Sequence, residues 1–226
     1  MRDVRAWGAI FDMDGVIVDT GWAHRQAWIE LAHIHGVPFT DQLFLQTFGM
    51  QNYQIIPIML GREVSPEDLE AIGNRKEQRY REIVAQGLTP AQGLVALLAD
   101  LKAHGFGIAV GSSAPKANID LVMDRLGIRS SFDAIVYGDM VTRSKPAPDT
   151  FLTAARMLDV PPARCVVVED AVPGVQAGKA AGMAVVAITT TRTRQDLVQA
   201  DRVIDRFTEV TAADFVTLLG SSSRQV

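Results

Sequence analysis

Short, almost entirely apolar runs alternate with helical patterns along most of the chain. Each run has the length and the apolar character of a strand that is buried on both faces. The predicted strands are residues 7–11, 106–111, 133–137, 164–168, 183–188 and 202–204. The predicted helices between them, with apolar residues three and four positions apart, are residues 94–104, 115–126, 147–158, 172–181 and 194–200. This alternation predicts a doubly wound α/β fold, in which helices cover both faces of a parallel sheet.

Residues 21–89 interrupt the alternation with a purely helical pattern. Helices are predicted there at residues 22–35, 43–48, 53–60 and 66–85. The last of these has a strong start signal, because Ser65 can cap it and Pro66 fits its first turn. We therefore expect a small all-helical domain, residues 21–89, inserted after the first strand of a core domain that comprises residues 1–20 and 90–226.

The composition fits a globular protein and argues against several classes of partner. Of the 226 residues, 48% are hydrophobic, and the formal net charge is −4 without long runs of one sign. This pattern argues against nucleic acid or an anionic membrane as a partner. The single cysteine, Cys165, lies in an apolar run, so we expect a buried thiol, no internal disulfide and a reducing compartment. Since no signal peptide or membrane-spanning run is evident, the expectation is a soluble cytoplasmic protein.

The first predicted strand ends at two acids, Asp12 and Asp14, which are followed by Gly15. An ionised carboxylate is costly to bury without a partner or a metal, so Asp12 should lie where the strand leaves the core and meets a cleft. Strand side chains repeat every two residues, so an extended chain would point both carboxylates into one site. Two converging carboxylates need a cation or a shared proton, and oxygen ligands suit Mg²⁺. Taken alone, the pair fits solvated acids in a turn equally well.

Polar residues also follow the other predicted strands. Ser112 and Ser113 precede a helix, where free N–H groups and a hydroxyl can bind an anion, although Ser113 also fits a plain N-cap. Lys145 lies just before another helix and fits either a ligand for a phosphoryl group or an ordinary surface lysine. Glu169 and Asp170 follow a buried apolar run and could complete the oxygen shell of a metal. Because the carboxyl ends of parallel strands meet at one edge of a sheet, these side chains are expected to gather there.

These residues stand in motifs that resemble those of a known family. The strings are Phe11-Asp12-Met13-Asp14-Gly15, Ser144-Lys145-Pro146-Ala147-Pro148-Asp149 and Glu169-Asp170, with Ser112 between the first two. In residue type and order they resemble the four motifs of the haloacid dehalogenase-like (HAD) superfamily, and most closely its subgroup of β-phosphoglucomutase and sugar-phosphate phosphatases. The resemblance extends over nearly the whole chain. It implies a Rossmann-like core, with residues 21–89 as a C1-type cap that opens and closes over the cleft.

The resemblance implies phosphoryl transfer to an aspartate, with Mg²⁺ as the cofactor. Asp12 would attack phosphorus and form an aspartyl-phosphate, and Asp14 would act as general acid and base. The implied metal site comprises Asp12, the backbone carbonyl of Asp14, Asp170 and, nearby, Glu169, and the implied phosphate site comprises Ser112, the Ser113 amide and Lys145. The dehalogenases and phosphonatases of the superfamily lack an acid at the place of Asp14, so carbon–halogen and carbon–phosphorus cleavage are not expected.

The helical residues 21–89 bear on the choice between hydrolysis and mutase chemistry. His24, Trp28 and Lys76 match residues of the mutase cap, although His24 also fits a capping or core histidine and Lys76 a solvated helix lysine. In the mutase an arginine follows a glycine and grips the distal phosphate, whereas the segment from Gly49 to Asn52 contains no arginine. A guanidinium is the usual clamp for a second phosphate. The prediction is therefore a phosphatase that acts on a small phosphate monoester such as a sugar phosphate, with Gly49 and Asn52 among its substrate contacts.

Two other functions stay open at this point. One is a phosphosugar mutase of the β-phosphoglucomutase type, with Arg62 or Arg79 supplying the clamp. The other is a catalytically inactive family member that binds a partner, against which the complete set of motif residues argues. The expected partner is a small phosphorylated metabolite, and the expected assembly is a monomer or a weak dimer.

Overall fold

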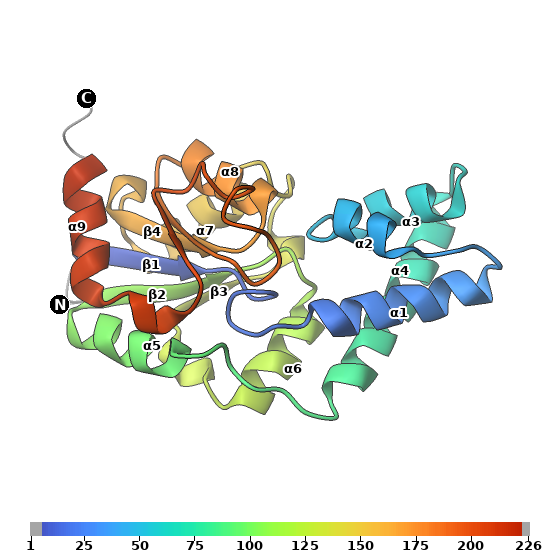
Figure 1. The fold of residues 1–226 in the computed structure, drawn as a ribbon, viewed down its shortest axis with the longest axis horizontal. Helices are drawn as coiled ribbons and strands as arrows, with labels where there is room; N and C mark the ends of the chain where they lie inside the picture. The colour runs from blue at the N-terminus through green and yellow to red at the C-terminus, as the bar shows by residue number, and fades with distance from the viewer. Residues whose placement is uncertain (1–5, 223–226) are drawn as a thin grey trace.

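The computed structural model describes residues 6–222, which include a six-stranded parallel sheet (Figure 1). The segments 1–5 and 223–226 of the expected core domain lie outside the described residues. The strands are β1 (Trp7–Phe11), β2 (Phe106–Gly111), β3 (Ala134–Val136), β4 (Cys165–Glu169), β5 (Ala184–Ile188) and β6 (Arg202–Ile204). Their order is β3-β2-β1-β4-β5-β6, so β1 is central and pairs with β2 and β4. The predicted α/β class is confirmed, and each predicted strand agrees to within one residue at either end.

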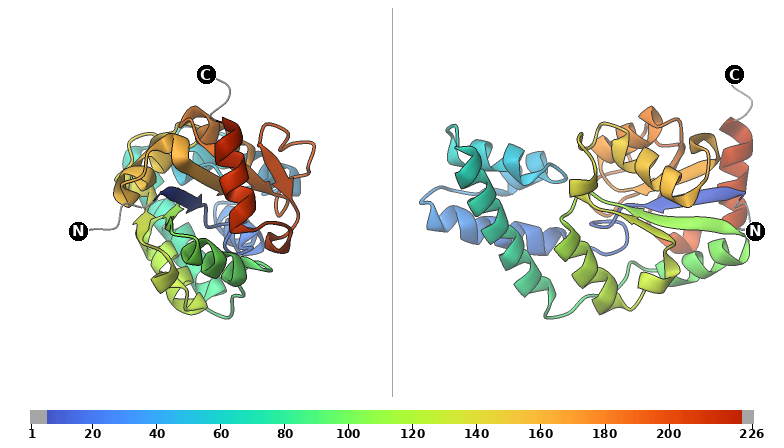
Figure 2. Two further views of the ribbon diagram at one scale, coloured as in Figure 1. Left: turned by 90° about the vertical axis from the view of Figure 1, so that its left-hand side faces the viewer. Right: turned by 180° about the vertical axis from the view of Figure 1, so that it is seen from behind.

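The side chains of the central strand alternate between two apolar layers. Ala9 and Phe11 belong to the cluster on one face of the sheet, and Ile10 belongs to the cluster on the other. The first face is covered by α5 (Leu94–Ala103), α6 (Lys116–Leu126) and α9 (Ala212–Ser222), and the second by α7 (Asp149–Leu158) and α8 (Val172–Ala180) (Figures 1 and 2). Burial on both faces explains why the strands are almost continuously apolar.

The remaining helices form a separate group, the α1–α4 region, beyond the carboxyl ends of the strands (Figure 1). They are α1 (Gly21–Ile34), α2 (Asp41–Thr47), α3 (Asn52–Leu60) and α4 (Pro66–Val84). Trp28 of α1 shares an apolar cluster with Ile56 of α3, and Ala27 shares another with Tyr80 of α4. The predicted start of α4 is confirmed, because the Ser65 hydroxyl accepts a hydrogen bond from the third amide beyond it at 3.2 Å.

Two features differ from the sequence analysis. The helix predicted at residues 194–200 is wrong, since this segment forms turns in which the Thr193 amide and hydroxyl both donate to Asp196. Leu197 is the only buried residue of this segment and Val198 is 71% exposed, so the segment has no apolar face that packing on the core would stabilise as a helix. Helix α9 was not predicted, although Phe215 and Leu219 lie four positions apart and are both buried.

The other described elements are short. The 3₁₀ turns are Arg129–Ser131, Gly138–Met140, Pro162–Arg164 and Phe207–Glu209. None of the helices within residues 6–222 is long and apolar enough to span a membrane.

Candidate active site

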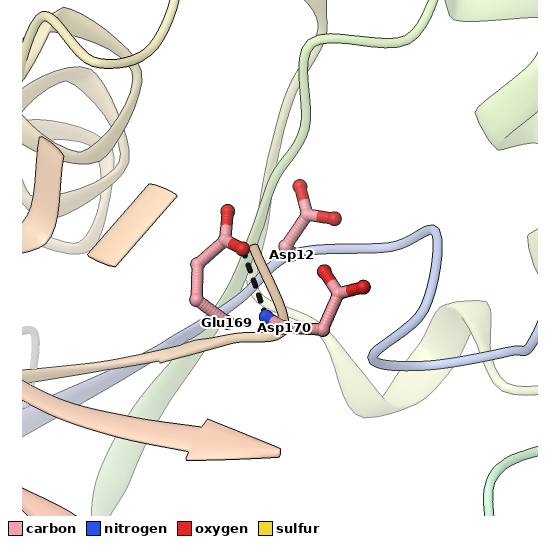
Figure 3. Close-up of side chains that lie close together, drawn as sticks. All are labelled: Asp12, Glu169 and Asp170. Carbon is pink, nitrogen blue, oxygen red and sulfur yellow. Dashed lines mark hydrogen bonds between the residues drawn. The ribbon is translucent and has the colours of Figure 1, made fainter. Parts of the chain in front are cut away.

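Three acids meet at the carboxyl ends of the two central strands. Asp12 directly follows β1, Glu169 is the last residue of β4, and Asp170 follows it. Because β1 and β4 are paired, one carboxylate oxygen from each of the three residues lies within 4.8 Å of the others (Figure 3). All three are buried, with 8%, 2% and 2% of their surfaces exposed. The structure therefore brings together the three acidic side chains that the sequence analysis assigned to a metal.

Lys145 is the cation of this cluster. Its Nζ donates to Asp12 Oδ1 and to Glu169 Oε1, each at 2.6 Å, and to the carbonyl oxygen of Gly111 at 3.2 Å. Only 6% of its side chain is exposed, so it is not the surface lysine that was the alternative at the level of sequence. Two short ion pairs and a carbonyl fix the ammonium group beside Asp12.

The charges in the cluster do not balance. Burial raises the pKa of Asp12 to about 7 against the attraction of Lys145, and the charge of Glu169 adds to the rise. The pKa of Asp170 lies well above its usual value because of burial and then the charges of Glu169 and Asp12. Burial would lower the pKa of Lys145, but the charges of Asp12 and Glu169 outweigh it and raise that pKa. Three buried carboxylates with one lysine have excess negative charge and hard oxygen ligands, which together fit Mg²⁺.

Backbone and small residues hold the acids in place. Glu169 Oε2 accepts hydrogen bonds from the amides of Asp170 at 2.9 Å and Ala171 at 3.1 Å. The hydroxyl of Thr191, a residue that the sequence analysis did not single out, donates to the carboxylate of Asp170. A Cβ added at Gly174 would overlap the Glu169 carboxylate, so only glycine fits there. The absence of a side chain at this position of α8 lets the helix approach the Glu169 carboxylate closely.

The side chain of Asp14 points into different surroundings. Its Oδ1 accepts hydrogen bonds from the hydroxyls of Thr20 and, at 3.1 Å, Tyr80, and it lies 3.3 Å from His24 Nε2. Gly15, with φ +82°, turns the backbone sharply just after the two acids, and its amide donates to the Val18 carbonyl at 2.8 Å. The Asp14 carboxylate is therefore not part of the acidic cluster of Figure 3, although both groups line one pocket.

The surroundings of Asp14 favour its ionised form. Burial would raise its pKa, but the electrostatic attraction of His24 and hydrogen bonds from His24 and Thr20 outweigh burial and lower it. His24 is itself fixed by Lys76, whose Nζ lies 2.7 Å from Nδ1. Nδ1 therefore faces the Lys76 ammonium and Nε2 faces Asp14, which fixes the orientation of the ring.

A pocket of about 610 Å³ lies between the acids and the α1–α4 region. All the predicted cap residues line it, namely His24, Trp28, Gly49, Asn52 and Lys76. The other side chains that face it from this region are largely apolar and include Phe44, Phe48, Met50, Tyr53, Ile55 and Leu69. The pocket is therefore polar where the strands end and mainly apolar on the opposite side.

Ser112 and Ser113 also line the pocket, beside the acids. The Ser112 hydroxyl accepts a hydrogen bond from the Ala114 amide at 3.1 Å. The N-cap reading of Ser113 is wrong, because α6 begins after Pro115, which has no side chain able to cap it. Ser113 is thus available for another role at this edge of the sheet.

The pocket wall formed by α4 and α6 contains a buried carboxylate that the sequence analysis missed. Glu77 is 6% exposed and accepts hydrogen bonds from Lys76, Asn52 and Asn118. Burial would raise the pKa of Glu77, but the charges of Lys76 and His24 and the hydrogen bonds from Lys76 and Asn118 hold it at about 2. Within its charged run, Glu77 resembled a solvated helix residue, and the sequence held no signal for its burial.

The two arginines considered as replacements for the mutase clamp lie elsewhere. Arg79 pairs with Glu30 at 2.5 Å and Glu82 at 3.0 Å, and Arg62 donates to the carbonyl oxygen of Glu63. No arginine lines the pocket among residues 6–222. In this structure, therefore, neither Arg62 nor Arg79 supplies a phosphate clamp.

Comparisons with known proteins agree with this geometry. The family model "haloacid dehalogenase-like hydrolase" matches residues 8–182. The chain is 36% identical over 179 residues to fructose-1-phosphate phosphatase YqaB of Escherichia coli, covering 78% of this chain and 93% of that protein. It is 35% identical over 210 residues to β-phosphoglucomutase of Bacillus subtilis, covering 89% and 90%.

A solved structure shows the same fold. The crystal structure of a HAD hydrolase of family IA, variant 3, from Entamoeba histolytica superposes with a TM-score of 0.88 at 27% identity. The match covers 95% of this chain and 99% of that one. The family model covers more than half of the chain and includes the acids, Lys145 and the α1–α4 region, so the chain belongs to the haloacid dehalogenase-like hydrolases.

Proposed function

We propose that this protein is a Mg²⁺-dependent phosphatase that hydrolyses a small sugar phosphate through an aspartyl-phosphate on Asp12. The observation that carries the proposal is the buried cluster in which Lys145 joins Asp12 and Glu169 beside Asp170, at one end of the pocket. Relatives named as phosphatases and as a phosphoglucomutase support phosphoryl chemistry on a phosphate monoester. A relative named as a fructose-1-phosphate phosphatase supports a sugar phosphate as the substrate.

In this proposal Asp12 is the nucleophile. Lys145 favours its ionised form, and Asp12 Oδ2 is free of the lysine and can attack phosphorus. The phosphoryl oxygens would be bound by Lys145, the Ser112 hydroxyl and the Ser113 amide. The metal would be held by Asp12, the backbone carbonyl of Asp14 and Asp170, with Glu169 nearby. Bound there, Mg²⁺ would supply positive charge to the phosphoryl oxygens in the transition state.

Asp14 is proposed as the general acid and base. Its lowered pKa makes it ionised in the free protein, which suits the base that takes a proton from water in the second step. The first step needs a proton on Asp14 for the leaving oxygen. A phosphate dianion entering the pocket would raise the pKa of Asp14 by like-charge repulsion and so favour its protonation. His24, Thr20 and Tyr80 hold the carboxylate in position for both steps.

The α1–α4 region is proposed as the cap domain, residues 21–89, that covers the site. It supplies one wall of the pocket, while residues 1–20 and 90–226 supply the other as the core domain. Closure of such a lid would exclude water until the phosphoryl group has moved to Asp12. Trp28 and the apolar wall would face the sugar, and Gly49 and Asn52 would approach its hydroxyl groups.

Mutase chemistry is the second candidate. It is favoured by His24, Trp28 and Lys76, which match the mutase cap and line the pocket, and by the similarity to β-phosphoglucomutase. A bisphosphate intermediate needs a strong clamp for its second phosphate. Because the described lining contains no arginine, hydrolysis is favoured. The intact set of site residues makes a role as an inactive binding protein the least supported reading.

The test is turnover of a generic aryl phosphate and of a sugar-phosphate panel, with and without Mg²⁺. Asp12→Asn is expected to abolish phosphate release, whereas Asp41→Asn, which changes an exposed acid paired with Arg25, should leave it unchanged. Near-normal turnover by Asp12→Asn would remove Asp12 as the nucleophile. The mutase assay is the conversion of β-glucose 1-phosphate to glucose 6-phosphate, primed with the bisphosphate. If this conversion is faster than phosphate release, the protein is a mutase and the proposed phosphatase function is wrong.

A further inference from the structure

The buried carboxylate of Glu77 has three hydrogen-bond donors directed at it from different elements. Lys76 Nζ donates to Oε1 at 2.8 Å, and Asn52 Nδ2 donates to the same oxygen at 2.8 Å. Asn118 Nδ2, from α6 on the other side of the pocket wall, donates to Oε2 at 2.6 Å. All four side chains line the pocket. One ammonium and two amide groups converging on a carboxylate is the arrangement that proteins use to bind an anion.

The hydrogen-bond donors of Lys76 and Asn118 are held so that they point at the Glu77 carboxylate. The Arg81 guanidinium donates to Asn118 Oδ1 at 2.9 Å, which orients the amide so that Nδ2 faces Glu77. Lys76 is 3% exposed, and its ammonium is shared between Glu77 Oε1 and His24 Nδ1. Asn118 has no exposed surface. A ligand that reaches this wall therefore meets donors that the protein's own anion already occupies.

The remaining charges on the pocket wall do not offer a substitute site. Away from the cluster around Asp12, the described lining carries the acids Asp14, Glu70, Glu77 and Asp139 and no arginine. Lys76 is the only lysine there, and Glu77 balances its charge. A second phosphate on a substrate would carry close to two negative charges into this wall without a free cation to receive them.

We infer that Glu77 is a specificity-determining residue, whose carboxylate fills an anion subsite of the pocket so that monophosphates are accepted and substrates with a second phosphate are rejected. The inference rests on the proposed function, because it takes the first phosphate to be bound at Asp12. It goes further in assigning the rejection to one side chain. Removal of the carboxylate should free Lys76, Asn52 and Asn118 to bind an anion from the ligand.

The test compares two sugars that differ by one phosphate, fructose 1-phosphate and fructose 1,6-bisphosphate. The measured quantity is the ratio of kcat/KM for the bisphosphate to kcat/KM for the monophosphate. The wild-type protein should prefer the monophosphate at least tenfold, and Glu77→Ala should raise the ratio at least tenfold. Glu77→Gln, which keeps the shape but not the charge, should raise it by less. Glu82→Gln, an exposed acid of the same helix paired with Arg79, should leave the ratio and the activity unchanged.

Binding provides a readout that does not need turnover. Titration calorimetry in the Asp12→Asn background should show that Glu77→Ala lowers the Kd of both sugars unequally. The Kd of fructose 1,6-bisphosphate should fall by a factor at least ten times larger than that of fructose 1-phosphate. A folded Glu77→Ala protein with an unchanged ratio in both assays would overturn the inference, as would a wild-type protein that uses both sugars equally. If both Glu77 variants fail to fold, equal use of the two sugars by the wild-type protein still overturns the inference. Absence of any wild-type turnover would refute the proposed function instead, and the binding arm would still test the inference.

Discussion

Replacing the proposed nucleophile should make the metal-free protein more stable while abolishing its activity. Asp12 is one of three buried carboxylates that share a single lysine, and its pKa is raised to about 7. Asp12→Asn removes one negative charge and keeps the shape of the side chain. Lys145 retains its 2.6 Å ion pair with Glu169 in this variant. The expected outcome is a folded protein of higher stability, opposite to the usual effect of changing a buried residue.

The size of the stability gain and its dependence on pH follow from the raised pKa of Asp12. The rise of the Asp12 pKa from 3.8 to about 7 corresponds to about 4 kcal/mol, which is an upper limit for the gain. Since the folded state holds this proton more tightly than the unfolded state, wild-type stability falls as the pH rises through the window from about 4 to about 7. The advantage of Asp12→Asn should therefore be small at the acid end of the window and complete above its upper end. For a chain of this size the full gain equals a rise in Tm of about 8–16 °C.

The assay is urea denaturation of both proteins in EDTA, at about pH 5 and about pH 8, on either side of the raised pKa. Added Mg²⁺ should stabilise the wild-type protein more than the variant, because the metal neutralises the same charge that the substitution removes. Equal stabilities above pH 7 in EDTA, or a difference that does not grow with pH, would refute the argument that excess negative charge at Asp12 is held in the folded protein.

Three further predictions concern the same cluster. Lys145→Met should abolish activity and lower the unfolding free energy of the EDTA-treated protein by about 3–5 kcal/mol in urea denaturation, because it leaves the buried carboxylates without a partner. The control Lys116→Met, which removes an exposed ion pair, should change the unfolding free energy little. Equal losses of unfolding free energy in the two variants would contradict the reasoning. Gly174→Ala should weaken Mg²⁺ binding in calorimetry, since the new methyl group overlaps the Glu169 carboxylate, whereas Gly220→Ala, with open space around it, should not. Chelation of the metal should stop phosphate release and Mg²⁺ should restore it, and activity that persists in EDTA would exclude the proposed cofactor.

The site residues differ in how far the sequence could predict them. Asp12, Glu169 and Asp170 each follow or end a continuous apolar run, and parallel pairing of those runs brings their ends to one edge. Such residues are predictable because the pattern that buries a strand also marks where it ends. Lys145 is less so, since its segment fits a surface loop until its ion pairs with Asp12 and Glu169 are seen.

Other partners have no local signal. Thr191 donates to Asp170 from a turn, and Tyr80 reaches Asp14 across 66 positions of the chain. Glu77 and Asn118 are 41 positions apart, on helices whose packing the periodicity does not specify. The local pattern also misled the prediction of the helix at residues 194–200, where apolar residues are present but only Leu197 is buried against the core.

The sequence by itself determined the α/β class, the strands, the helical character of residues 21–89 and the acids and lysine of the candidate site. These properties depend on the alternation of apolar and polar positions and on the residues that end each run, which are local. Only the tertiary structure decided where the Asp14 carboxylate points, what covers the pocket and that Glu77 is buried within its wall. Those outcomes depend on which helix faces meet, and that is set by the packing of side chains far apart in the chain.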